Sequence, residues 1–98
     1  MEKQKTERPD RPVLVTTEYR GVFFGYATDT DGDSIQLKRA RCALYWPANQ
    51  KGFLGLANMG PLDGSRIGPA ADITLRKITC VAEVTPEAVV RWETAPWR

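Results

Sequence analysis

The chain has 98 residues, and its 14 lysines and arginines nearly balance its 12 aspartates and glutamates, which gives a formal net charge of +2. This length allows one domain, and so small a net charge is not typical of a protein that captures double-stranded nucleic acid. The sequence contains no histidine, which removes the commonest general base and the commonest metal ligand. We therefore expect a protein that is not an enzyme and that uses no metal or other cofactor.

The N-terminal residues 1–12 are polar, carry charges of both signs and include two prolines, a composition typical of a disordered tail. We expect a single globular domain over residues 13–98. No stretch reaches about 18 consecutive apolar residues, and the N-terminus lacks the apolar segment of a signal peptide. We therefore expect no membrane association and a cytoplasmic location.

β-Branched and aromatic residues dominate the first half of this domain. They favour strands over residues 13–17, 21–27, 34–38 and 40–46. The dipeptide Lys38–Arg39 interrupts the apolar alternation between the last two segments, which is typical of a β-bulge.

A hairpin signal separates the second and third of these segments. Asp31–Gly32 is typical of a two-residue turn, because such a turn needs a positive φ at both central residues. With this turn Tyr26 would lie opposite Leu37. One face of the sheet would then be core and the other would face solvent. The core face would carry Phe24, Tyr26, Ile35 and Leu37.

Glycines and prolines become frequent after residue 47. Residues 52–60 contain apolar side chains at i, i+3 and i+4 spacing, followed by Gly60 as a C-cap, which predicts a short helix. The apolar positions of this helix are Phe53, Leu56 and Ala57. Residues 60–70 form a long glycine-rich loop, and long loops in compact domains are often functional.

The last third of the chain predicts two strands and a helix. Residues 72–76 alternate strictly, and residues 78–84 form a second strand that could continue the first through a bend. Thr85-Pro86-Glu87 is typical of a helix start, and the helix ends near Pro96. Its apolar stripe comprises Ala88, Val89 and Trp92. Together these elements predict an α+β, mostly β fold: a small antiparallel sheet or partly open barrel with a short internal helix and a C-terminal helix.

Two groups of side chains could carry chemistry but favour a structural interpretation. Cys42 and Cys80 stand in apolar runs, and we expect both to be reduced core thiols. The acidic residues Asp29, Asp31 and Asp33 do not follow the spacing of an EF-hand calcium loop, so we interpret them as a solubilising hairpin tip.

The sequence offers one candidate anion-binding segment. Within Gly64–Gly68, flexible backbone amides, the Ser65 hydroxyl and the Arg66 guanidinium could surround a phosphate. A plain turn is the alternative.

A strand region also combines cationic and aromatic side chains. Arg41, Tyr45 and Trp46 could bind a nucleotide, because arginine pairs with phosphate and bases stack on aromatic rings. The alternative is a half-buried strand end with Trp46 in the core. Trp92 is expected to anchor the last helix, whereas Trp97, next to the C-terminus, could form a subunit or partner contact.

Apolar alternation and glycines across residues 13–92 resemble a family of small uncharacterised proteins of tailed phages and prophages, known as a domain of unknown function. The resemblance rests on Val13, Val15, Thr17, Gly21, Val22, Gly25, Ile35, Leu37, Ala40, Arg41, Tyr45, Trp46, Leu56, Ala57, Gly60, Asp72, Ile73, Leu75, Thr85, Glu87 and Ala88. It implies a phage accessory protein in the bacterial cytoplasm and no known activity.

The functional hypothesis is therefore a non-enzymatic phage or prophage accessory protein, a binding module that acts on a host or phage macromolecule, with counter-defence as one such role. The alternative is a protein that binds or sequesters a small ligand such as a nucleotide. Its site would comprise Arg41, Tyr45, Trp46, Ser65 and Arg66. A homo-oligomer is compatible with either hypothesis.

Overall fold

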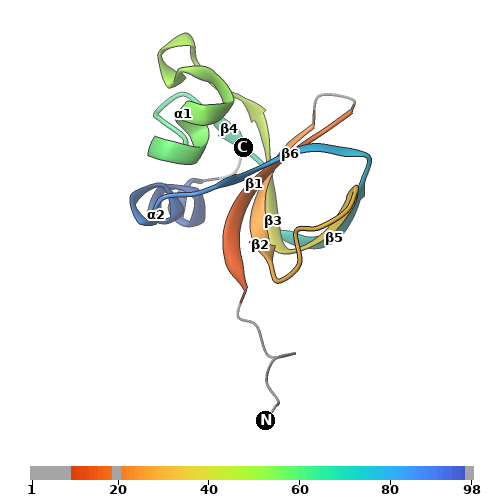
Figure 1. Ribbon diagram of the computed structural model, residues 1–98. Helices are drawn as coiled ribbons and strands as arrows, with labels where there is room; N and C mark the ends of the chain where they lie inside the picture. Colours follow the sequence, from red (N-terminus) through yellow and green to blue (C-terminus); the bar gives the residue numbers. More distant parts are fainter. Residues whose placement is uncertain (1–9, 19–20, 97–98) are drawn as a thin grey trace.

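The computed structural model describes residues 10–18 and 21–96 (Figure 1). In that part of the chain six strands form one antiparallel sheet in the order β4-β3-β2-β1-β6, with β5 also paired to β3. The elements are β1 (Arg11–Thr17), β2 (Val22–Ala27), β3 (Ser34–Tyr45), the 3-10 helix η2 (Ala48–Gln50), α1 (Gly52–Met59), β4 (Arg66–Ile67), β5 (Ala71–Arg76), β6 (Ile78–Glu83) and α2 (Pro86–Thr94). The expected mostly β fold with an internal and a C-terminal helix is confirmed.

Strand β1 begins earlier than residue 13. Arg11 and Pro12 already pair with Ala27 and Tyr26 of β2. Strand pairing therefore extends two residues into the segment predicted as a tail, while residues 1–9 lie outside the described part of the chain.

The predicted two-residue hairpin turn is wrong. β2 ends at Ala27 and β3 begins at Ser34, so six residues, 28–33, connect the strands. Gly32 has the expected positive φ of 84°, but Tyr26 lies opposite Lys38 instead of Leu37. A register shift of one residue turns side chains to the opposite face of a sheet.

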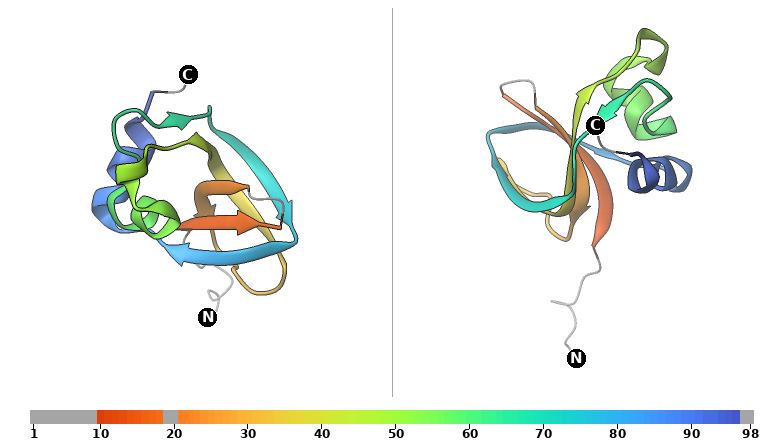
Figure 2. Two further views of the ribbon diagram at one scale, coloured as in Figure 1. Left: turned by 90° about the horizontal axis from the view of Figure 1, so that it is seen from above. Right: turned by 180° about the vertical axis from the view of Figure 1, so that it is seen from behind.

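Both faces of the sheet are consequently buried, and the prediction of one solvent-facing side is also wrong. One apolar group, the helix-side cluster, lies between the sheet and the helices. It comprises Leu14, Val22, Phe24, Tyr26, Ala43, Leu56, Ala57, Ile67, Val84, Ala88 and Trp92. The other, the inner cluster, lies on the opposite face, around which the sheet curls (Figure 2). It comprises Val13, Val15, Ala27, Ile35, Leu37 and Ala40.

The curl of the sheet arises where β5 continues into β6. Lys77, with a φ of 57°, joins the two strands, of which β5 pairs with β3 and β6 with β1. A nearly continuous bent strand therefore links opposite parts of the sheet, as the sequence predicted. The Ile78 amide donates to the Asp33 carbonyl at 3.0 Å and fastens this bend to the β2–β3 connection.

A β-bulge at Arg39 lets β3 contribute side chains to both apolar clusters. Phe24 lies opposite Arg41 and Tyr26 opposite Lys38, so β3 contains one extra residue here, and Arg39 has a φ of 52°. The Asp72 carboxylate accepts a hydrogen bond from the Arg39 amide at 2.9 Å. The predicted bulge is confirmed, and beyond it Arg41 and Ala43 point to the helix side.

The helices begin and end as the sequence predicts. Gly60 follows α1 with a φ of 78°, and its amide donates to the Leu56 carbonyl. The Thr85 hydroxyl caps α2 by accepting from the Ala88 amide at 3.1 Å.

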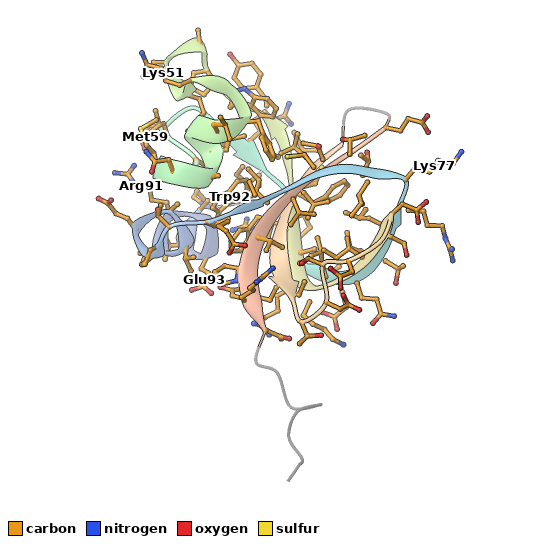
Figure 3. All side chains as sticks on the ribbon, in the orientation of Figure 1. Lys51, Met59, Lys77, Arg91, Trp92 and Glu93 are labelled. Carbon is orange, nitrogen blue, oxygen red and sulfur yellow. The ribbon has the colours of Figure 1, made fainter. Side chains whose placement is uncertain are left out.

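Trp92 anchors α2 on the sheet (Figure 3). Its side chain is fully buried and stacks on Phe24 with ring centroids 5.1 Å apart. Its indole N–H donates to the Leu56 carbonyl of α1 at 3.1 Å, which ties the two helices together.

The cysteines are both free, but only one of them is partly buried. Cys42 is half-buried, and burial raises the pKa of its thiol. Cys80 is exposed, so the prediction of a second core thiol is wrong. β6 is an edge strand that pairs with β1. Val81 packs on the inner cluster, so the side chain of the preceding residue, Cys80, points outward.

Candidate functional site

Arg41 is buried between the sheet and α2. Its side chain donates three hydrogen bonds to backbone carbonyls: Nε to Gly68 at 2.7 Å, and Nη1 to Trp92 at 2.8 Å and Ala95 at 2.6 Å. Two of these acceptors lie at the C-terminal end of α2, where carbonyls lack helical partners and where a positive charge is favourable. The geometry therefore gives Arg41 a structural role as the cap of α2.

A polar cluster lies beside Arg41 on the helix side of the sheet. The Tyr26 hydroxyl donates to the Glu93 carboxylate, and the Arg39 guanidinium carbon lies 4.3 Å from the centre of the Tyr26 ring. Burial, and then the hydrogen bond to Glu93, raise the pKa of Tyr26 from 10.0 to about 12. These interactions fasten α2 to β2 and to the bulge of β3.

A second bulge lies at the C-terminal end of β3. Ala43 pairs with Ile67 and Tyr45 with Arg66, so β3 advances two residues where β4 advances one. The extra residue is Leu44. Ala43 is buried in the helix-side cluster, whereas Leu44 and Tyr45 are 57% and 54% exposed. Because of the bulge, the consecutive side chains of Leu44 and Tyr45 are both exposed to solvent.

Arg66 of β4 lies opposite Tyr45 and adds a third side chain to this exposed region. Its neighbour Ile67 is buried in the helix-side cluster, and successive side chains of a strand point to opposite faces. Arg66 is therefore exposed on the face away from the helices, directly opposite Tyr45. Leu44, Tyr45 and Arg66 therefore form one exposed surface at the end of β3.

Trp46 points the other way. It is partly buried and packs on the helix-side cluster, as the structural alternative predicted. The structure thus brings Tyr45 and Arg66 together but separates them from Arg41 and Trp46. Trp97 lies outside the described residues.

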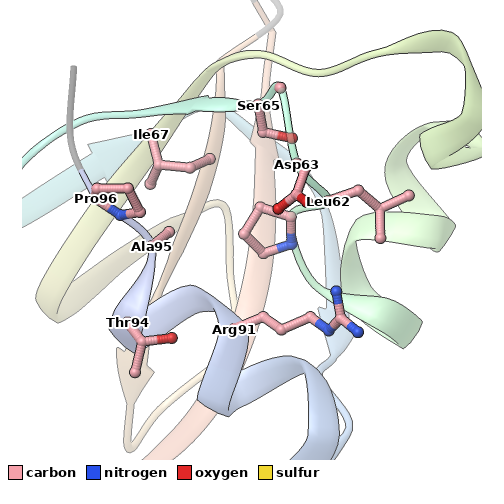
Figure 4. A pocket seen from close by; sticks show the side chains of 10 residues that line it. Leu62, Asp63, Ser65, Ile67, Arg91, Thr94, Ala95 and Pro96 are labelled. Carbon is pink, nitrogen blue, oxygen red and sulfur yellow. The ribbon is translucent and has the colours of Figure 1, made fainter.

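Ser65 lies in a pocket of about 290 Å³, lined by residues 61–65 and 67 and by α2 and the residues after it (Figure 4). Its hydroxyl oxygen is buried and has no hydrogen-bond partner within the described chain. Three side chains that the sequence did not single out also line this pocket: Asp63, Arg91 and Thr94. Their sequence spacing gave no signal, because α2 meets the loop only through tertiary packing.

Within residues 10–18 and 21–96, no group of three or more cysteines, aspartates or glutamates is arranged to hold a metal ion. Within the same ranges, none of the helices has the length and apolarity needed to cross a membrane.

Comparison with known proteins gives a family but no relative of known function. No curated protein and no solved structure matches the chain. One family, described as Domain of unknown function (DUF6948), matches residues 10–92, which contain the sheet, α1 and most of α2. The chain therefore belongs to the DUF6948 family, a domain of unknown function.

Proposed function

We propose that the protein is a non-enzymatic binding module that attaches to a protein partner through the surface formed by Leu44, Tyr45 and Arg66, which we call the docking surface. The observation that carries this proposal is the bulge at Leu44, which exposes Leu44 and Tyr45 together beside Arg66. Tyrosine and arginine are enriched among the side chains that dominate binding energy at protein interfaces. Because Ala43 and Trp46 on either side of the bulge remain packed on the core, the exposed pair is held on a rigid strand.

The same arrangement favours a protein over a nucleotide. A nucleotide site was expected to combine the Arg41 guanidinium with Tyr45 and Arg66. Arg41 instead directs Nε and Nη1 to three backbone carbonyls, and it points to the opposite face from Arg66. A phosphate at Arg66 would therefore have one arginine contact, supported by a net charge of only +2.

The absence of histidine from the sequence supports a role without catalysis, because the commonest general base is missing. On the resemblance to phage and prophage proteins we further propose an accessory protein of that origin, acting in the bacterial cytoplasm. Counter-defence against the host is one such role.

A capture experiment with matched variants tests the docking surface. Tagged wild-type protein and the variants Tyr45→Ala, Leu44→Ser and Arg66→Ala are exposed to the same bacterial lysate, and the retained proteins are quantified by mass spectrometry. Leu54→Ser is the control, because Leu54 is 71% exposed but lies on α1. A genuine partner is retained by the control and reduced at least about tenfold by Tyr45→Ala.

Two outcomes would contradict the proposal. One is retention of the same proteins, in the same amounts, by wild type and by all three surface variants. The other is saturable micromolar binding of mono-, di- or cyclic nucleotides in calorimetry, abolished by Arg66→Ala. That result would establish the small-ligand alternative.

A further inference from the structure

A pocket of about 270 Å³ lies between the bulge of β3 and the C-terminal end of α2, apart from the docking surface. Its volume is just below the range of about 300–1,000 Å³ that is typical of sites for drug-sized ligands, so it suits a smaller molecule. Two aromatic rings and two guanidinium groups contribute to its lining. The lining residues are Phe24, Tyr26, Arg39, Arg41, Ala70 and Glu93.

Arg41 is held rigidly at this pocket, and part of its guanidinium is unused. Nε and Nη1 donate to three backbone carbonyls, which fixes the plane of the group. Within residues 10–18 and 21–96 Nη2 forms no hydrogen bond, and the one side-chain polar atom there that is both buried and unpartnered is the Ser65 hydroxyl oxygen. Nη2 therefore keeps accessible surface, and its two N–H groups can donate to a molecule in the pocket.

Arg39 is placed at the same pocket by the bulge. Its guanidinium carbon lies 4.3 Å from the centre of the Tyr26 ring, which is the distance of a cation–π contact. The Asp72 carboxylate accepts a hydrogen bond from the Arg39 amide, so the backbone at this position is fixed as well. The two arginines therefore line one pocket from defined positions on β3.

The lining of this pocket carries an excess of positive charge. Its single carboxylate, Glu93, accepts the hydrogen bond of the Tyr26 hydroxyl. Neither arginine forms an ion pair within the described part of the chain. Burial lowers the pKa of Arg41, because its charged form is held away from water. Two arginines against one glutamate leave one net positive charge, which favours an anion with a single negative charge.

We propose that this pocket binds a small monocarboxylate with an apolar body. The carboxylate would accept hydrogen bonds from Arg41 Nη2 and from the Arg39 guanidinium, and the apolar body would lie against Phe24 and Ala70. One carboxylate can serve both arginines, because its two oxygens offer about four acceptor sites. Such a ligand also supplies the opposite charge that the buried Arg41 lacks among the described residues.

Other ligand classes fit this pocket less well. A phosphate or other polyanion would bring a second negative charge close to Glu93. A metal ion or an organic cation would be repelled by the two arginines. An uncharged apolar molecule would cover Arg41 Nη2 without giving it an acceptor.

The test is an NMR titration of ¹⁵N-labelled full-length protein with benzoate, phenylacetate and hexanoate. Each carboxylate is compared with the corresponding primary amide, which has nearly the same shape but no charge. For at least one carboxylate we expect saturable shifts in the backbone N–H signals of residues 24–26, 39–41, 70 and 93, and in the side-chain Nε–H signal of Arg41. The primary amides should bind at least about tenfold more weakly, since they lose the charge-assisted contacts.

Variants locate the ligand. Arg39→Gln removes one of the two guanidinium groups and should weaken binding at least about tenfold, whereas Arg66→Gln, the same change on exposed β4, should leave Kd unchanged. Ala70→Leu should also weaken binding, because the larger side chain occupies the pocket while both arginines remain. Arg41 is left unchanged, since it also caps α2. The backbone N–H spectrum shows in the same experiment that each variant is folded.

Three results would overturn the inference. The first is that no carboxylate shows saturation up to about 10 mM, a concentration at which even a millimolar site is largely filled. The second is that the primary amides bind as tightly as the carboxylates, because the two guanidinium charges would then play no part. The third is that Arg39→Gln and Ala70→Leu bind as tightly as wild type, which would place the ligand elsewhere. None of these results bears on the docking surface, whose residues do not line this pocket.

Discussion

Replacing Arg41 with methionine should be the most damaging single change at the junction of β3 and α2. Arg41→Met keeps a long apolar side chain but removes every hydrogen-bond donor. The carbonyls of Gly68, Trp92 and Ala95 then lose their partner in a part of the protein where Arg41 itself is only 7% exposed.

The expected loss is large compared with the stability of a domain of this size. A hydrogen bond from a charged donor contributes about 1.5–3 kcal/mol, and a buried carbonyl left without a partner costs about 1–3 kcal/mol, so the three carbonyls together account for several kcal/mol. We therefore expect the free energy of unfolding to fall by about 3–5 kcal/mol, out of a typical total of about 5–15 kcal/mol. At about 4–8 °C for each kcal/mol, the melting temperature should fall by more than about 12 °C.

Urea denaturation followed by tryptophan fluorescence measures this loss, with Arg66→Met as the matched control. Arg66 is exposed on the neighbouring strand β4, and its replacement should change the free energy of unfolding by less than about 0.5 kcal/mol. A loss below about 1 kcal/mol for Arg41→Met would refute the assignment of Arg41 as the cap of α2.

Three further predictions concern positions where the local environment sets the outcome. The stabilising interactions of the neutral Tyr26 phenol, whose pKa is raised to about 12, are fully present below pH 10 and lost as the pH rises from 10 towards 12. Tyr26→Phe should abolish this loss of roughly 2–3 kcal/mol in denaturation experiments; an unchanged pH profile would contradict it. Gly60→Ala should lower the melting temperature more than Gly32→Ala, because both have a positive φ but only at Gly60 would the new Cβ lie 2.8 Å from the Ala88 carbonyl oxygen. The exposed Cys80 should react with a thiol reagent well before the half-buried Cys42, and equal rates would argue against the described burial.

Local sequence signals predicted most elements of this fold because each of these is encoded within a few residues. The 3-10 helix η2 was missed, and so was the short strand β4 (Arg66–Ile67), which lies inside the predicted loop 60–70 and is defined by pairing with β3. The Thr85 N-cap, the Gly60 C-cap and the bulge at Arg39 all depend on residues close in sequence, and all three are confirmed. The register between strands, by contrast, depends on pairing between residues that local signals do not connect. The six-residue connection 28–33 therefore could not be distinguished from a two-residue turn at Asp31–Gly32, and the face assignments that followed from that turn were wrong.

The candidate sites show the same limit. Tyr45 and Arg66 could each be selected by residue type, but their meeting across β3 and β4 follows from strand pairing. The carbonyls that Arg41 binds lie 27 to 54 residues away in sequence. Nothing in the local sequence therefore pointed to its structural role, and Arg41 was interpreted as a ligand anchor. Arg91 gave no signal at all, since a charged residue in the last turn of a helix is usually solvated.

The central claim, that the surface around Tyr45 meets a partner, is tested most directly by site-specific photo-crosslinking in bacterial cells. Tyr45→p-benzoylphenylalanine places the crosslinker on the docking surface, and Leu54→p-benzoylphenylalanine places it on α1, at a position that is more exposed than Tyr45. We expect a discrete crosslinked protein from position 45 that is absent from position 54 and lost when Arg66→Ala is added. No adduct from position 45, or the same adducts from both positions, would contradict it.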